Sequence, residues 1–122
     1  MRALLVISLT TALGFIILAL PVCAYDNYAA IAYSESTGAW GSGYNFSSRA
    51  AAEMRAMSRC GSGDCEIKVW FVNACGALAV GRDGALGWGW ADSRAEAENI
   101  ALAECHSRGS GCGIRCWACT DR

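Results

Sequence analysis

The pattern of hydrophobic and polar positions changes its period in the same order twice along the chain. Two short alternating segments joined by a turn predict a β-hairpin, a segment of helical period follows, and an apolar run then predicts a strand. In the first half these elements are expected at 28–33, 40–45, 49–60 and 66–72. In the second half the hairpin is expected around 82–84, the helix at 94–107 and the strand at 113–118. The predicted order is ββαβ twice over, an α+β fold.

Small residues recur on one face of each predicted helix, at Ala52, Ala56 and Cys60 and again at Ala97, Ala101 and Cys105. The second strand of each half places its glycines, 41 and 43 or 87 and 89, on one side, because strand side chains alternate. We therefore expect each helix to pack closely against the glycine side of its hairpin. The aromatic residues of those strands would then lie on the opposite face.

The two halves are copies of one another. Gly38 to Tyr44 recurs as Gly84 to Trp90, Ser48 to Glu53 as Ser93 to Glu98, and Trp70 as Trp117. About 45 residues cannot bury a core unaided, so the halves are expected to close on each other as one pseudo-twofold domain with an antiparallel sheet and two helices. The halves are placed at about 28–75 and 76–119 of a single domain spanning 25–122.

The N-terminal segment has the pattern of a secretory signal peptide. An uncharged run from Ala3 to Leu20 follows Arg2 and ends in Pro21 and the small-residue sequence Val22-Cys23-Ala24. Cleavage after Ala24 would leave a secreted or periplasmic chain of residues 25–122, without a membrane span. Two alternatives stay open, an uncleaved membrane anchor and lipid attachment at Cys23.

Composition narrows the classes of function. The chain has 122 residues, 54% hydrophobic and 17% charged, which excludes disorder through excess charge. A net charge of −1 gives no general attraction to nucleic acid, so no nucleic-acid partner is expected. The single histidine leaves few candidates for a general base.

Seven of the eight cysteines lie in the expected mature chain, where export favours disulfides. The repeat predicts one short bond in each half, Cys60–Cys65 and Cys105–Cys112. A third bond, Cys75–Cys119, is expected to join the halves. Cys116 aligns with the apolar Val69 and is expected to remain a free thiol.

Two other interpretations of these cysteines are open. Cys116 and Cys119 have the spacing of a dithiol redox motif, although no helix follows them to lower a thiol pKa. The second interpretation is a zinc site formed by Cys75, Cys112, Cys116 and Cys119. Export disfavours it, because in an oxidising compartment disulfides form before a metal is bound. We expect neither a metal nor another cofactor.

The mature chain resembles the family named domain of unknown function 4189, which comprises small exported bacterial proteins. The resemblance covers nearly all of 28–119 and rests on the Ala-Ala-Ile-Ala-Tyr-Ser opening, the Ser-Arg-Ala-Ala-Ala-Glu helix start, the segment from Trp70 to Ala79 and the closing cysteines. It implies a disulfide-bonded domain with six usual cysteines, and Cys116 departs from that pattern. The resemblance supplies no catalytic residue.

Two classes of function follow. The first is a non-catalytic domain that binds an unknown protein or cell-envelope ligand through the aromatic residues Trp88, Trp90, Tyr44 and Trp40, because aromatic side chains on one strand face supply contact area. The same face would instead be buried if the duplicated sheet formed a second core. The second class is a small secreted hydrolase with His106 as general base and Glu104 or Asp64 as its orienting carboxylate.

Overall fold

Six strands and two helices follow one another in the computed structural model, which describes residues 26–122. The first repeat contains β1 (Tyr28–Tyr33), β2 (Trp40–Phe46), α1 (Arg49–Cys60) and β3 (Glu66–Val72). The second contains β4 (Cys75–Val80), β5 (Leu86–Ala91), α2 (Arg94–His106) and β6 (Gly113–Cys119). The α+β fold with duplicated ββαβ halves is confirmed. Only element ends differ: β2 and β6 are one residue longer than expected and α2 is one residue shorter.

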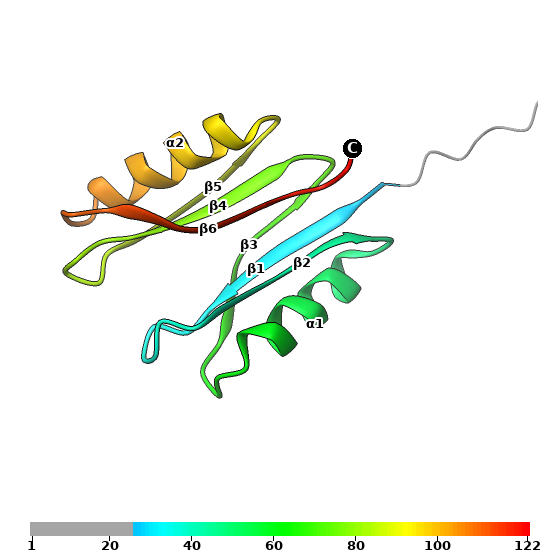
Figure 1. The fold of residues 1–122 in the computed structure, drawn as a ribbon, viewed down its shortest axis with the longest axis horizontal. Helices are drawn as coiled ribbons and strands as arrows, with labels where there is room; N and C mark the ends of the chain where they lie inside the picture. The colour runs from blue at the N-terminus through cyan, green and yellow to red at the C-terminus, as the bar shows by residue number, and fades with distance from the viewer. Residues whose placement is uncertain (1–25) are drawn as a thin grey trace, which may run out of the picture.

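The strands divide into two antiparallel three-stranded sheets, in the orders β2-β1-β3 (sheet A) and β5-β4-β6 (sheet B). The sheets lie face to face, with β3 against β4 and β5, and with β2 against β6. Each helix covers the outer face of its own sheet, so the layers run α1, sheet A, sheet B, α2 (Figure 1). The sequence predicted an antiparallel sheet, and the structure divides its strands between two stacked sheets.

Side-chain capping fixes where each helix begins. The hydroxyl of Ser48 accepts a hydrogen bond from the backbone N–H of Ala51, and that of Ser93 accepts one from Glu96. Gly61 ends α1 in the left-handed conformation, with φ of 70°, which glycine adopts without strain. These caps define both ends of α1 and the start of α2.

The helices pack on the glycine side of the hairpins, as predicted. Ala52, Ala56, Ala97 and Ala101 are fully buried. A Cβ atom added to Gly87 would overlap the carbonyl oxygen of Ala101 and the backbone nitrogen of Cys105. Because the helix backbone itself touches the strand, neither surface has room for a larger side chain.

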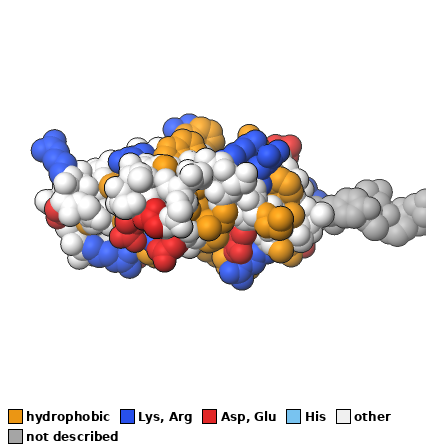
Figure 2. All heavy atoms as spheres, turned by 90° about the horizontal axis from the view of Figure 1, so that it is seen from below, with side chains coloured by type: hydrophobic (Ala, Val, Ile, Leu, Met, Phe, Trp, Pro, Cys, Tyr) orange, Lys and Arg blue, Asp and Glu red, His pale blue; other side chains and the backbone are white. Residues whose placement is uncertain are grey.

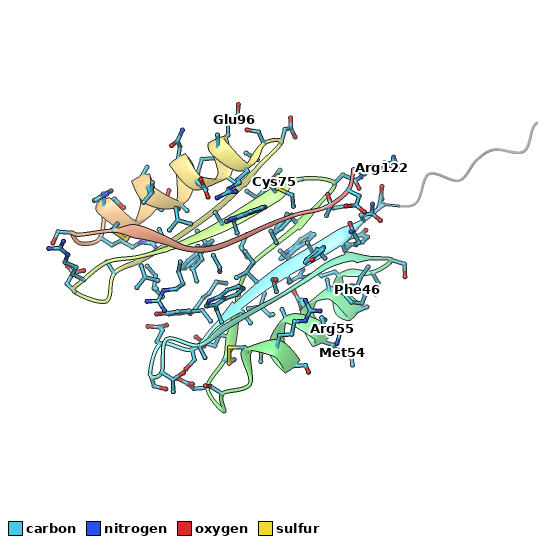
Figure 3. The ribbon with its side chains drawn as sticks, in the orientation of Figure 1. Phe46, Met54, Arg55, Cys75, Glu96 and Arg122 are labelled. Carbon is cyan, nitrogen blue, oxygen red and sulfur yellow. A yellow bond between two sulfur atoms is a disulfide. The ribbon has the colours of Figure 1, made fainter. Side chains whose placement is uncertain are left out.

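A separate hydrophobic core fills the space between the two sheets (Figure 3). Its largest fully buried side chains are those of Ile31, Phe71 and Leu78. Strand alternation explains this layer, because the residues next to those facing the helices point to the other sheet. The face opposite the glycines is therefore covered mainly by the partner sheet.

Three disulfides join the cysteine pairs expected from the repeat, Cys60–Cys65, Cys75–Cys119 and Cys105–Cys112, and Cys116 is a buried free thiol. One expectation about them is wrong. Cys75 is the first residue of β4 and pairs directly with Cys119 on β6, so this bond links neighbouring strands of sheet B and does not join the halves. The chain passes from sheet A to sheet B through Asn73 and Ala74, one residue earlier than the expected boundary.

The expected signal peptide, its cleavage site after Ala24 and the alternative lipid site at Cys23 lie outside the described residues. Within 26–122, neither helix is long and apolar enough to cross a membrane.

Candidate functional site

The four aromatic residues expected to bind a partner lie on two different edges of the molecule. Trp40 and Tyr44 are on β2, which faces β6, and Trp88 and Trp90 are on β5, which faces β3. Because β2 and β5 are edge strands of different sheets on opposite sides of the sandwich, the four side chains form no common surface. Whether any of them binds a partner stays a prediction.

Trp88 and Trp90 also differ from each other in burial. Trp88 is half-buried and packs against the core between the sheets, whereas Trp90 is 57% exposed. The sequence left two possibilities for this face, burial in a second core or exposure at the surface, and each applies to one of the two residues. Trp88 belongs to the second core, and Trp90 is available at the surface.

A groove of about 460 Å³ opens where the edges of β3 and β5 lie against each other. A smaller hollow of about 200 Å³, which also borders Trp70 and Trp90, contains Phe71 and Val72 in its wall. The larger groove has aromatic, aliphatic and charged residues in its lining: Lys68, Val69, Trp70, Trp88, Gly89, Trp90, Ile100, Glu104 and Arg108. We call it the β3–β5 groove.

The cations of this groove are already paired. Lys68 Nζ lies 3.0 Å from a carboxylate oxygen of Glu35 and 3.0 Å from one of Glu66. Burial lowers the pKa of Lys68, but the hydrogen bonds to these two carboxylates outweigh it and leave the pKa above its ordinary value. Arg108 pairs with Glu104 at 3.6 Å. The groove therefore offers little unpaired charge to a ligand.

The same two cations flank the Trp88 ring. The guanidinium carbon of Arg108 lies 5.1 Å and Lys68 Nζ lies 5.9 Å from its centroid. Both distances are within the range of cation–π attraction. These contacts add to the packing of the Trp88 ring, which forms one wall of the groove.

Trp70 was not identified as a candidate from the sequence, although its match with Trp117 in the repeat was a usable signal. Trp70 is 40% exposed and borders both hollows. The Arg49 guanidinium lies 4.3 Å from its ring centroid, and Arg94 lies 3.8 Å from that of Trp117. An Arg at the first position of each helix therefore holds the exposed Trp of the last strand of its repeat.

A second exposed apolar surface lies on α1. Met54 is 72% exposed and, with Met57 and Ile67, borders a shallow open hollow. Figure 3 shows Met54 on the side of α1 away from sheet A. In the space-filling view from below, hydrophobic patches alternate with acidic and basic side chains (Figure 2). This surface lacks the aromatic walls of the β3–β5 groove.

The residues considered for hydrolysis are not assembled into a site. His106 is an exposed residue at the C-terminal end of α2, where the helix dipole favours it. Glu104 pairs with Arg108, and Asp64 accepts hydrogen bonds from the Ser34 hydroxyl at 2.5 Å and the Ser36 N–H at 3.3 Å. Both carboxylates are thus engaged by groups other than the imidazole.

The cysteines considered for redox chemistry are separated by the strand itself. Cys116 faces the core between the sheets, while Cys119 is bonded to Cys75 and packs with the cluster under α2. Burial raises the pKa of the Cys116 thiol to about 12, so it is protonated at neutral pH. The three other cysteines considered for zinc are in disulfides, and residues 26–122 contain no group of three His, Cys, Asp or Glu placed to hold a metal.

Together these features define a small disulfide-bonded α+β protein made of two ββαβ repeats. The chain belongs to the family DUF4189, a domain of unknown function, whose model matches residues 28–119.

Similar proteins come from mycobacteria. The chain is 41% identical over 96 residues to Protein Rv1269c of Mycobacterium tuberculosis and to Protein Mb1300c of Mycobacterium bovis, covering 79% of this chain and 72% of each relative. It is also similar to the NMR structure of Rv1813c from Mycobacterium tuberculosis, with 28% identity, a TM-score of 0.60 and coverage of 97% of this chain and 99% of that one. These relationships define the family and the fold and assign no activity.

Proposed function

We propose that this protein is exported and acts by binding a protein or cell-envelope partner in the β3–β5 groove. The observation that carries the proposal is the exposure of Trp90, 57%, beside Trp70 and Trp88 at the border of one groove. Exposed Trp side chains next to a concavity are typical of residues that dominate binding energy. The groove supplies apolar contact area, and its rim supplies paired charges.

Export is supported by the N-terminal pattern and by the disulfides. Three bonds among seven cysteines of residues 25–122 suit an oxidising compartment. The proposed mature protein is the single duplicated domain at 25–122, after cleavage following Ala24. N-terminal sequencing of the secreted or periplasmic protein tests this, and an N-terminus at Met1 or Cys23 would contradict it.

The binding test compares two matched variants. Trp90→Ala removes the proposed contact, and Tyr44→Ala changes the equivalent residue of the first repeat, which is 46% exposed on the other edge. Both purified proteins, with wild type, are immobilised and exposed to a cell-envelope extract of the producing bacterium, separated into protein and glycan fractions. Saturable capture by wild type should weaken at least about tenfold in Trp90→Ala, as expected for an exposed hot-spot Trp.

Two results would contradict the proposed function. The first is equal capture by wild type and Trp90→Ala, or loss only in Tyr44→Ala. The second is turnover of a peptide, ester or glycan substrate that disappears in His106→Ala. Thermal melts of both variants accompany the assay, and the exposure of both side chains predicts little change in stability.

A further inference from the structure

We propose that the partner in the β3–β5 groove is an extended polypeptide, which adds as a strand to the free edge of β5. This inference rests on the proposed function and specifies its ligand. β5 is the outer strand of sheet B and pairs with β4 alone. An edge strand carries backbone groups without a partner, and strand addition is a common way to recognise an extended peptide.

The hairpin register identifies which backbone groups point outward. The Gly81 N–H donates to the Ala85 carbonyl at the turn, and β4 and β5 then pair without a bulge from Val80↔Leu86 to Cys75↔Ala91. In antiparallel pairs the hydrogen-bonded positions alternate, so the N–H and C=O groups of Leu86, Trp88 and Trp90 point away from β4. The bond that Arg108 Nη1 donates to the Leu86 carbonyl, at 3.1 Å, agrees with this direction.

The outward groups at Trp88 and Trp90 border the groove. Gly89, which lies between them, has no side chain and lines the groove with its backbone. The Leu86 carbonyl accepts a hydrogen bond from Arg108. Within residues 26–122, no side chain forms such a hydrogen bond with the backbone of Trp88 or Trp90. This leaves one stretch of edge, two residues further along, open to a peptide.

The first repeat closes the same position of its own edge. Ser42 on β2 is the equivalent of Trp88, and its carbonyl accepts a hydrogen bond from Arg59 Nη1 at 3.2 Å. Arg59 precedes Cys60, and the residue that precedes Cys105 in the second repeat is Glu104, a carboxylate that cannot donate. The first repeat therefore has a side-chain donor that blocks strand addition at this position, and the second repeat does not. The open copy also has Trp in place of Ser42 and Tyr44.

The chemistry of the groove favours a peptide backbone with apolar side chains. Its cations are neutralised by Glu35, Glu66 and Glu104, so the groove does not select a charged ligand. A strand beside β5 would place alternate side chains toward Trp88 and Trp90 and the others toward Ile100 on α2. A segment of six residues, about 20 Å long when extended, spans β5.

The shape of the groove disfavours a second copy of the chain as the occupant. Trp70 and Ile100, which are 40% and 41% exposed, line the groove from the β3 side and from α2. In a twofold dimer the same recessed edge would face itself, and the flanking side chains would hold the two β5 strands apart. A single extended chain is narrow enough to enter.

The test uses a library of random heptapeptides displayed on phage, selected on the oxidised mature protein. Enriched peptides should carry apolar side chains at alternate positions. In the complex with a synthetic enriched peptide, the amide protons of Trp88 and Trp90 should exchange with solvent at least about tenfold more slowly than in the free protein. The amide of Gly89, which already faces β4, should change little.

A substitution that copies the closed edge provides the matched variant. Glu104→Arg places a donor where the first repeat has Arg59, and it should weaken peptide binding at least about tenfold. Glu96→Arg makes the same charge change on an exposed residue near the other end of α2 (Figure 3) and should bind like wild type. Circular dichroism should show both variants folded.

Several outcomes would overturn strand addition: no enriched heptapeptide, an enriched peptide that leaves both tryptophan amides unprotected, or equal binding by Glu104→Arg and Glu96→Arg. Protection of these amides that rises with protein concentration alone would assign the edge to a second copy. Capture from the glycan fraction that depends on Trp90 would overturn strand addition and keep the proposed function. Equal capture by wild type and Trp90→Ala would contradict the proposed function itself.

Discussion

Cys75 and Cys119 are directly opposite residues of β4 and β6, with Cα atoms 4.0 Å apart and their sulfurs bonded. The equivalent pair in the first repeat is Tyr28 and Val72, which face each other across β1 and β3 without a covalent bond. The disulfide therefore fixes the register of sheet B only. The two halves are held together by the core between the sheets and by polar contacts such as the one from Arg115 Nη1 to the Gly38 carbonyl, at 2.9 Å.

The three disulfides are expected to contribute unequally to stability. Replacing Cys75 and Cys119 by Ala should lower the free energy of unfolding by about 4 kcal/mol, and replacing Cys60 and Cys65 by about 2 kcal/mol, because a bond across a longer loop restricts the unfolded chain more. The sequence separations are 44 and 5. Guanidinium melts of the two double variants measure the difference. An equal or reversed order would show that the unfolded-state argument fails here.

Cys116 should be inert in the folded protein. Because burial raises its pKa to about 12, iodoacetamide at pH 8 should label no cysteine of the native mature chain. In guanidinium without reductant it should label one, identified by peptide mapping. The raised pKa also predicts that stability falls as the pH rises past the usual thiol value of 9.0 toward about 12, since the unfolded chain loses its proton first.

The control for this thiol is Cys116→Val, which introduces the residue found at the equivalent position, Val69. This variant should fold, show no labelling and lack the Cys116 contribution to the alkaline loss of stability. Rapid labelling of native wild type would contradict the burial of Cys116. A second thiol in the unfolded chain would contradict the three-disulfide assignment.

The close contact of α2 with β5 predicts that a larger side chain on the buried face of α2 lowers the stability of the protein. Ala101→Leu adds three heavy atoms at a fully buried position and should cost about 1 to 3 kcal/mol of stability through overpacking. Ala103→Leu, on the exposed side of the same helix, should change stability little. Ala56→Leu in α1 should behave like Ala101→Leu. Denaturant melts that show equal stability for the buried and exposed variants would disprove this helix register.

Asp64 should make part of the stability depend on acid pH. The hydrogen bond from the Ser34 hydroxyl, with a further bond from Ser36, holds the pKa of this carboxyl below its ordinary value. A carboxyl with a lowered folded pKa stabilises the fold above its unfolded pKa, and this contribution is lost as the pH falls through the folded value. Urea melts between pH 7 and pH 2.5 should therefore show a smaller acid loss for Asp64→Asn than for wild type. Parallel losses would contradict the assignment.

Local patterns were sufficient to predict the elements and the helix packing. The four-residue recurrence at Ala52, Ala56 and Cys60 defines a helix face, and the alternation at Gly41 and Gly43 defines a strand face that can receive it. Both faces are encoded within about 20 residues, so no distant part of the chain is needed to bring them together. The repeat then allowed the cysteine pairs to be predicted, since each short bond had a copy.

The candidate site was predicted only in part, because its walls come from segments far apart in the chain. Trp88 and Trp90 could be placed on one strand face from their spacing. Trp70, in the other sheet, gives no local sign that it lies next to Trp90. The hydrogen bond by which Arg59 closes the edge of β2 is likewise visible only in the folded structure. The same holds for the lack of such a donor at Glu104.

Residue spacing within one repeat, or comparison of the two repeats, is enough to predict four features of this protein. They are the order of the elements, the duplication, the glycine-lined contact of each helix and the cysteine pairs. Three further features appear only in the folded protein: the six strands form two stacked sheets, Trp88 is half-buried while Trp90 is exposed, and β3 lies over β5. The physical reason is that hydrophobic alternation specifies which face of a strand must be buried. It does not specify which distant face will cover it.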